Sequence, residues 1–445
     1  MKTAGVSAAG TIYDGNGEKD GVRNTSLSGH LGYSLTRDLS IDISIRTIRT
    51  KLDIDNFGGN FGDDPNNLQD YDATLFKAEL RGLFLKSRWE QKLSFSIVDY
   101  DRRQSNPVDP VHPLDSEDAR FESRMYKLSW QNNLFLHETN TLTFGMEHQI
   151  EQGESEYHSM SLFGPFSSVF PFQKAWTTSL YIQDQIRLGG MFFATVGSRL
   201  DFHSQFVSTI TFRIAPSYLI KSTDTRFKAT YGTGFKAPSL YQLYAPPTFY
   251  APVGNGGLEP EKSSGWDVGI EQSLLSKKML LGITYFNNSY KNLILYDYLS
   301  GFFNVGRAYS RGIEAFVRMK PLMNLTVSAE YTSTHAKDRD TDEYLLRRPR
   351  NKFTTRVQWD FLDNAWLSLN MIYTGKRQDM MWIGWTPTLV TMGDFLLLNA
   401  ALTYELSKGF ELFLRVDNIL DAEYELVKGY GTYGRAFYTG FQVKL

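Results

Sequence analysis

The sequence predicts an all-β protein, a transmembrane antiparallel up-and-down β-barrel of about 20 strands. Segments of about 10 to 18 residues in which apolar and polar side chains alternate recur along the 445-residue chain, as in half-buried strands. The connections between them alternate between tight turns and long loops. Tyr and Phe number 25 and 31, although the mean hydropathy is −0.33. A sheet with lipid on one face and water on the other explains both facts, because its apolar and polar contributions cancel.

Individual segments show the alternation clearly. Leu325, Val327 and Ala329 occupy every second position of one segment. Thr326 and Ser328 lie between them, so the two sets of side chains face opposite sides of a strand,. On this pattern we expect strands near residues 2–13, 25–36, 39–50, 73–86, 88–104, 118–135, 140–155, 174–187, 191–203, 206–220, 225–235, 263–275, 279–296, 301–320, 324–338, 347–361, 365–376, 394–406, 409–426 and 434–445.

The connections between the expected strands predict the orientation of the barrel. Several are too short for anything but a hairpin turn, such as 36–39, 86–88 and 362–364,. The intervening connections are mostly long. The longest are expected at residues 51–72, 105–117, 156–173, 236–262 and 377–393. Outer-membrane barrels have short periplasmic turns and long extracellular loops, so the long loops are expected outside the cell.

Composition excludes several classes of protein. The chain has no cysteine, which excludes disulfides, thiolate metal sites and cysteine nucleophiles,. A net charge of −2 argues against nucleic acid as a partner,. No segment has the roughly 20 consecutive apolar residues of a membrane-spanning helix. The seven histidines show neither metal-binding spacing nor a catalytic motif, so we do not expect an enzyme,.

Four motifs follow one another in the second half of the chain. Their residues also have a structural interpretation, since glycine permits close approach and proline ends strand pairing. They are YGTGFKAPSL at 231–240, GNGGLEPEKS at 254–263, NVGRA at 304–308 with RGIEA at 311–315 and RRPRNK at 347–352, and VDNILDAEY at 416–424. In this order the motifs resemble the barrels of TonB-dependent outer-membrane receptors, particularly the cobalamin and siderophore receptor type.

The resemblance implies a function and a location. A receptor of this class lies in the outer membrane of a Gram-negative bacterium, surrounded by lipid. It binds a scarce extracellular small ligand, cobalamin or a ferric siderophore, and is energised through TonB. We expect no enzymatic activity and no organic cofactor.

The resemblance also implies parts that the chain does not contain. Family members carry a TonB box and a plug domain before a barrel of 22 strands, and residues 4–11 resemble the third strand of that barrel. We therefore expect residues 1–445 to form one barrel domain, about 20 strands of a 22-strand barrel, incomplete at its N-terminus and without plug. Contact with TonB is then expected only through the missing N-terminal part.

The expected loop at 236–262 is the candidate ligand-binding segment. It carries four aromatic residues, Tyr241, Tyr244, Phe249 and Tyr250, whose rings can stack on a large flat ligand,. The alternative is that these rings belong to the aromatic belt at the membrane interface.

The expected loop at 51–72 is the candidate metal-binding segment. Asp63, Asp64, Asp70 and Asp72 provide carboxylate oxygens, the ligands that Ca²⁺ prefers,. The resemblance supports calcium, because the cobalamin receptor has calcium sites in comparable loops. The alternative is a set of solvated loop acids.

Two other functional classes remain open from the sequence. A passive outer-membrane porin or diffusion channel needs a closed barrel of its own and a constricting loop. A soluble secreted β protein would not depend on detergent. Uptake of a specific ligand that depends on TonB distinguishes a receptor from a porin.

Overall fold

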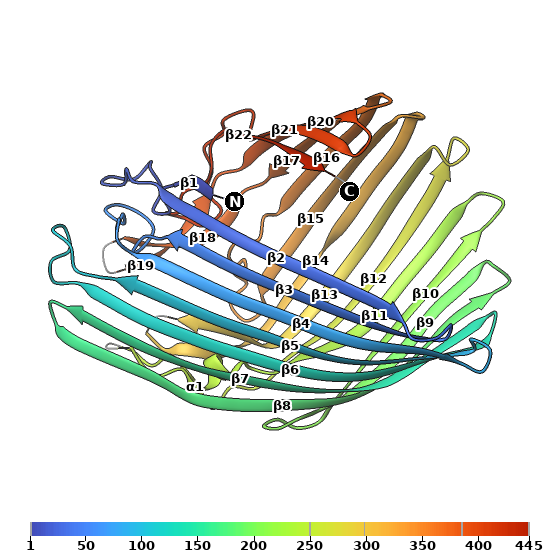
Figure 1. Cartoon of the computed structure of the whole chain (residues 1–445), viewed down its shortest axis with the longest axis horizontal. Helices are drawn as coiled ribbons and strands as arrows, with labels where there is room; N and C mark the ends of the chain where they lie inside the picture. Colours follow the sequence, from blue (N-terminus) through green and yellow to red (C-terminus); the bar gives the residue numbers. More distant parts are fainter. Residues whose placement is uncertain (1, 249–250, 298, 384–385, 444–445) are drawn as a thin grey trace.

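The described residues form one large, curved antiparallel sheet whose strands follow one another in chain order (Figure 1). The structure is a computed structural model that describes residues 2–248, 251–297, 299–383 and 386–443. Within these residues the large sheet contains twenty strands and a separate sheet contains two. The expectation of an up-and-down barrel of about 20 strands is confirmed.

Each strand of the large sheet pairs with the next one in sequence. The strands are β1 (Lys2–Val6), β2 (Asp20–Ser34), β3 (Leu39–Asp53), β4 (Leu68–Phe84), β5 (Trp89–Asn106), β6 (Ser116–His137), β7 (Asn140–Ser161), β8 (Gly164–Leu188), β9 (Phe192–His203), β10 (Thr209–Ile220), β11 (Thr225–Lys236), β12 (Glu261–Leu274), β13 (Met279–Asp297), β14 (Gly301–Leu322), β15 (Leu325–Asp338), β16 (Asn351–Leu362), β17 (Ala365–Thr374), β20 (Phe395–Ser407), β21 (Phe410–Asp417) and β22 (Ala436–Val443). The remaining elements are the hairpin of β18 (Arg377–Ile383) and β19 (Thr386–Met392), and the short helix α1 (Leu240–Tyr244).

Strand β5 shows how the alternation positions the two faces. Leu93 and Phe95 have exposed fractions of 46% and 39%, and Ile97 continues the same face. Ser94 and Ser96 lie on the opposite face. Apolar side chains exposed along a whole strand face lipid in a membrane barrel, so the serine face is the inner wall. Among the described residues, no helix is long and apolar enough to cross a membrane.

The two ends of the strands carry connections of different length. At one end, here called the turn end, connections of two to four residues join the strands at 35–38, 85–88, 138–139, 189–191, 221–224, 275–278, 323–324, 363–364 and 408–409. The opposite end, here called the loop end, carries most of the long connections, including 7–19, 54–67, 237–260, 339–350 and 418–435. The predicted asymmetry is therefore confirmed, and the loop end is the extracellular one.

Several expected segments differ from the structure, among them the strand expected at 409–426, which ends at Asp417. The loop expected at 156–173 continues the β7–β8 pairing to Ser161 and Gly164, because this hairpin extends past the lipid zone, where no apolar face is required. The loop expected at 377–393 is the β18–β19 hairpin. The strand expected at 2–13 ends at Val6, and the connection 7–19 turns at Gly10 and Gly15, which have φ values of 83° and 82°,.

Within the part of the chain that the structure describes, the two edges of the large sheet do not pair with each other. Among the described residues, β22 pairs only with β21, and β1 pairs with β2 only as far as Arg23. The edges are instead connected through loops, where Gly431 N donates to Ala8 O at 3.0 Å and Gly59 N donates to Gly429 O at 2.9 Å. The sheet therefore has a seam that is bridged at its loop end.

Candidate functional site

Helix α1 forms because its sequence supplies both halves of a capping box. The Ser239 hydroxyl accepts a hydrogen bond from Gln242 N at 3.2 Å, and Gln242 Oε1 accepts one from Ser239 N at 2.9 Å,. Leu240 is buried and packs against Phe170 and Ala175 of β8. The cap starts the helix, and the apolar contact holds it against the neighbouring wall.

The side of β8 that α1 covers is the inner wall. Ala175 lies on the same face of β8 as Ser179, because the two residues are four positions apart and side chains alternate along a strand,. Ser179 is buried in a polar network in which its hydroxyl donates to Asp201 at 2.5 Å and accepts from Arg199 at 2.7 Å. Such a network belongs to the water-filled side of a barrel. The connection 237–260 therefore folds inward over the wall, with α1 beside the loop ends of β7 and β8 (Figure 1).

A cavity of about 450 Å³ lies between α1 and this wall, within the size range of small-ligand sites. Its lining comes from β5, β6, β7, β8 and α1. The apolar and aromatic side chains are Val98, Tyr100, Phe121, Met125, Phe170, Leu240 and Tyr241, and the charged ones are Glu122, Arg124, Glu151 and Glu154. Here this space is called the inner-wall cavity. Tyr241 is 45% exposed and meets Phe170 edge to face at 6.3 Å between ring centroids.

A cation lies beside the inner-wall cavity. Arg102 is paired with Phe121 across β5 and β6, and its guanidinium carbon lies 4.0 Å from the centre of the Phe121 ring. The Nε atom of Arg102 is buried without a hydrogen-bond partner. A guanidinium next to aromatic rings can bind an anionic oxygen while the rings contact a flat group.

The predicted aromatic residues are only partly brought together. Tyr241 lines the inner-wall cavity, whereas Tyr244 OH accepts a hydrogen bond from Gln205 Nε2 at 2.8 Å on the loop side. Phe249 and Tyr250 lie outside the described residues. Sequence reasoning missed Arg102 and the aromatic residues of the wall. The alternation within the strands indicated that these side chains point inward. It did not indicate which strands α1 would cover.

The predicted acidic residues also separate. Asp70 and Asp72 lie in β4, where they pair with Lys51 at 3.1 Å and Arg49 at 3.4 Å. They therefore do not join Asp63 and Asp64, which lie in the connection 54–67. The pairs with Lys51 and Arg49 are exposed.

Asp63 holds the neighbouring connection 7–19. One of its oxygens accepts from Gly17 N at 2.5 Å and Glu18 N at 2.8 Å, and the other accepts from the Ser7 hydroxyl at 2.9 Å. Backbone donors at these distances satisfy a carboxylate well. Asp63 therefore orders the connection that carries Glu18 and ends at Asp20.

Three other carboxylates form a cluster next to Asp63. Glu18, Asp20 and Asp55 each place one oxygen within 4.8 Å of the others. Asp20 is 6% exposed, and its Oδ1 is buried without a hydrogen-bond partner. Burial, together with the nearby carboxylates of Asp20 and Asp55, raises the pKa of Glu18 to about 7. Burial also raises the pKa of Asp55. Such a concentration of negative charge suits an oxygen-preferring cation.

The fold and the inner-wall cavity define an outer-membrane β-barrel with a ligand-sized cavity on its extracellular side. The family model described as TonB dependent receptor-like, beta-barrel matches residues 10–419. The chain therefore belongs to this family, and it is an outer-membrane receptor and transporter barrel of a Gram-negative bacterium.

Solved structures of similar fold include three transport proteins. The siderophore receptor PirA from Acinetobacter baumannii is 16% identical with a TM-score of 0.78, covering 99% of this chain and 74% of that one. A variant of the ferric enterobactin receptor PfeA from Pseudomonas aeruginosa is 20% identical with a TM-score of 0.76, covering 99% and 72%. The copper transporter OprC is 13% identical with a TM-score of 0.77, covering 96% and 72%. At these identities the similarity shows the fold.

Proposed function

We propose that this barrel receives a ferric siderophore with aromatic iron-binding groups from outside the cell and, in the intact protein, passes it inward with TonB energy. The observation that carries the proposal is the inner-wall cavity, which Tyr100, Phe121 and Tyr241 line, with Arg102 against the Phe121 ring beside it. Aromatic faces contact flat aromatic groups, and a guanidinium attracts the negative charge of a ferric chelate. Receptors for siderophores among the similar folds support the same ligand class.

Binding to the detergent-solubilised chain tests the ligand. Ferric enterobactin is titrated while tryptophan fluorescence is recorded, and cyanocobalamin is titrated in parallel. We expect ferric enterobactin to bind and the Arg102→Gln variant to bind about tenfold more weakly, the loss of one charged interaction of about 1.5 kcal/mol. Tyr241→Ala should weaken binding in the same direction.

The matched control is Arg103→Gln. Arg103 follows Arg102 in β5, so its side chain lies on the outer face, where it contacts Asp101 at 3.1 Å,. This variant should bind as the unaltered chain does. Binding of cyanocobalamin alone, insensitive to Arg102→Gln, would replace the siderophore with cobalamin.

Uptake in cells tests the energy source. We expect cells that carry the gene to accumulate labelled ferric siderophore only when TonB is present. Accumulation that neither saturates nor depends on TonB would instead support a passive diffusion channel.

We also propose that Glu18, Asp20 and Asp55 bind Ca²⁺. Three carboxylates within 4.8 Å of one another, with a buried Asp20 oxygen that lacks a partner, fit an ion that prefers oxygen ligands,. This group is different from the four aspartates predicted from the sequence. A bound cation would stabilise the junction of connections 7–19 and 54–67.

A further inference from the structure

Two neighbouring extracellular connections meet at a buried aspartate outside the sites described above. They are 54–67, between β3 and β4, and 107–115, between β5 and β6. Asn66 Nδ2 donates to Pro107 O at 2.6 Å, and Asn106 Nδ2 donates to Asp64 Oδ2 at 2.7 Å. Asp64 is only 1% exposed. The carboxylate of Asp64 is therefore buried where the two connections meet.

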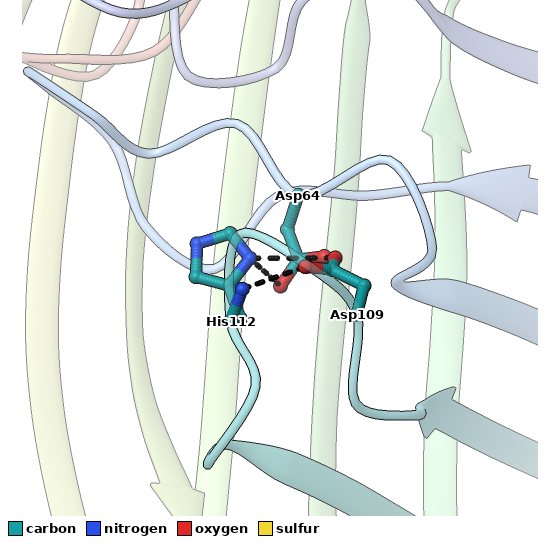
Figure 2. Close-up of side chains that lie close together, drawn as sticks. All are labelled: Asp64, Asp109 and His112. Atoms are coloured by element: carbon teal, nitrogen blue, oxygen red, sulfur yellow. Dashed lines mark hydrogen bonds and ion pairs between the residues drawn. The ribbon is translucent and has the colours of Figure 1, made fainter.

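The carboxylates of Asp64 and Asp109 point toward the imidazole of His112 (Figure 2). His112 Nδ1 lies 3.7 Å from Asp64 Oδ2 and 3.5 Å from Asp109 Oδ2. A tetrahedral zinc ion about 2.1 Å from each ligand separates the ligand atoms by roughly 3.4 Å. The two separations from His112 exceed that value by a few tenths of an ångström at most, and all three ligand atoms lie within 4.8 Å of one another.

The backbone holds two of the three ligands in place. Asp109 Oδ1 accepts hydrogen bonds from Val111 N and His112 N, both at 2.6 Å. This turn leaves Asp109 Oδ2 directed to the imidazole. The His112 side chain is 21% exposed, so the group can be reached from solvent.

An independent observation indicates a missing partner at this position. Asp64 Oδ1 is buried and has no hydrogen-bond partner, and the same holds for Oδ1 of Asn106, which contacts Asp64 and is 4% exposed. An unsatisfied buried oxygen, above all on a carboxylate, is unfavourable. Among the described residues, His112 is the one basic side chain whose nitrogen lies within 4.0 Å of an Asp64 carboxylate oxygen. Asp64 Oδ2, which lies 3.7 Å from His112, already accepts hydrogen bonds from Asn56 and Asn106 at 2.6 and 2.7 Å, so the oxygen that lacks a partner is Oδ1 of the same buried carboxylate. A cation bound to this carboxylate would offset its buried negative charge.

We propose that Asp64, Asp109 and His112 bind a divalent transition-metal ion of the zinc type, with water in the fourth position. The imidazole decides against calcium, because Ca²⁺ takes oxygen ligands while zinc accepts nitrogen and carboxylate together. Two ligands come from one connection and one from the other, so the ion ties 54–67 to 107–115. This site is separate from the proposed ligand uptake and does not depend on it.

Zinc titration of the full chain in detergent, after removal of metals, tests the proposal. Millimolar Ca²⁺ is kept throughout, so that the Glu18, Asp20 and Asp55 cluster is saturated. Isothermal titration measures Zn²⁺ binding, and the visible absorption of Co²⁺ reports nitrogen and carboxylate coordination. We expect one Zn²⁺ per chain, binding at least about tenfold more weakly in His112→Gln and in Asp109→Asn.

The matched control is His137→Gln, an exposed histidine at the turn end. This variant should bind one Zn²⁺ as the unaltered chain does, and Zn²⁺ should raise the melting temperature of both. Circular dichroism confirms that each variant keeps its sheet. Equal zinc binding by His112→Gln and the unaltered chain, or no binding up to millimolar Zn²⁺, would overturn the proposal and leave an ion pair only.

Discussion

At the scale of single residues, adjacent aspartates serve different partners. Asp63 accepts hydrogen bonds from the connection 7–19, whereas Asp64 accepts one from Asn106 at the end of β5. Next to Asp63, the half-buried Glu18 has a pKa of about 7, because burial and neighbouring carboxylates disfavour its charged form,. The protonation of Glu18 is therefore coupled to the stability of the loop end.

Raising the pH should destabilise the metal-free chain through Glu18. The folded pKa of about 7 exceeds the ordinary value of 4.5, so the folded state holds a proton that the unfolded state releases between these pH values. Stability then falls as the pH rises through this window. We expect the melting temperature in chelator to be lower at pH 8 than at pH 5, and Ca²⁺ to remove the difference.

The Glu18→Gln variant isolates this effect. It should lose part of the pH dependence, whereas Glu138→Gln, at an exposed turn-end position, should retain all of it. An identical pH profile in Glu18→Gln and the unaltered chain would show that Glu18 is not the group that titrates.

At the scale of elements, the β18–β19 hairpin joins two extracellular connections. Asp379 of β18 is fully buried, and it pairs with Arg347 at 2.8 Å. The backbone N–H groups of Lys428 and Met380 donate to the same carboxylate, each at 2.8 Å. These donors hold the pKa of Asp379 below its usual value, although burial acts to raise it. One carboxylate thus connects the hairpin to both 339–350 and 418–435.

Removing this carboxylate should loosen the hairpin. Asp379→Ala leaves the N–H donors without an acceptor, at a cost of about 2 kcal/mol. We expect limited proteolysis of the hairpin to become about 30-fold faster, since cleavage follows the population of the open form.

Asp342→Ala provides the comparison. Asp342 pairs with Lys337 at 2.9 Å, but its side chain is 80% exposed, so its loss should cost at most about 0.5 kcal/mol,. If both variants were cleaved at the same rate, Asp379 would not anchor the hairpin.

At the scale of the whole molecule, the seam distinguishes this sheet from a closed barrel. Unpaired backbone groups are unfavourable in lipid, yet β2 beyond Arg23 and β22 each lack a second partner among the described residues,. At the loop end, the connections 7–19 and 418–435 bridge the seam through side-chain contacts. Tyr13 OH donates to Glu425, and Lys428 lies 5.4 Å from the centre of the Tyr13 ring.

Crosslinking tests whether loops 7–19 and 418–435 join across the seam. The chain has no cysteine, so introduced thiols react without background. We expect a short bis-maleimide to link Tyr13→Cys to Glu425→Cys within one chain, shown by a mobility shift on denaturing gels.

The pair of Tyr13→Cys with Asp342→Cys is the control, because Asp342 lies in the separate connection 339–350. This pair should remain unlinked. Efficient linking of the control, or none in the first pair, would mean that the loops do not keep this arrangement.

Period-two alternation and connection length were enough to predict the strands and the loop end. Both are local properties, since a residue such as Leu93 faces lipid because of its own strand's pleat,. The β18–β19 hairpin and the β7–β8 extension were missed because they lie beyond the lipid zone, where no apolar face distinguishes a strand from a loop. The candidate site was harder to predict. Tyr241 was identified as an aromatic residue of a long loop, whereas nothing near Arg102 in the sequence indicated that it would lie against Phe121 beside a cavity that α1 covers.

The sequence by itself thus determined the all-β class, the barrel topology and the membership of a receptor family, because these depend on patterns within strands and on ordered motifs. Only the tertiary structure decided which side chains meet. The inward fold of the connection 237–260 brings Tyr241 of α1 to the cavity that Phe121 of β6 lines. Asp72 lies in β4 and Asp63 in the connection before it, so they lie apart although only nine positions divide them. Contacts of this kind depend on the register and closure of many strands together, and no single segment contains that information.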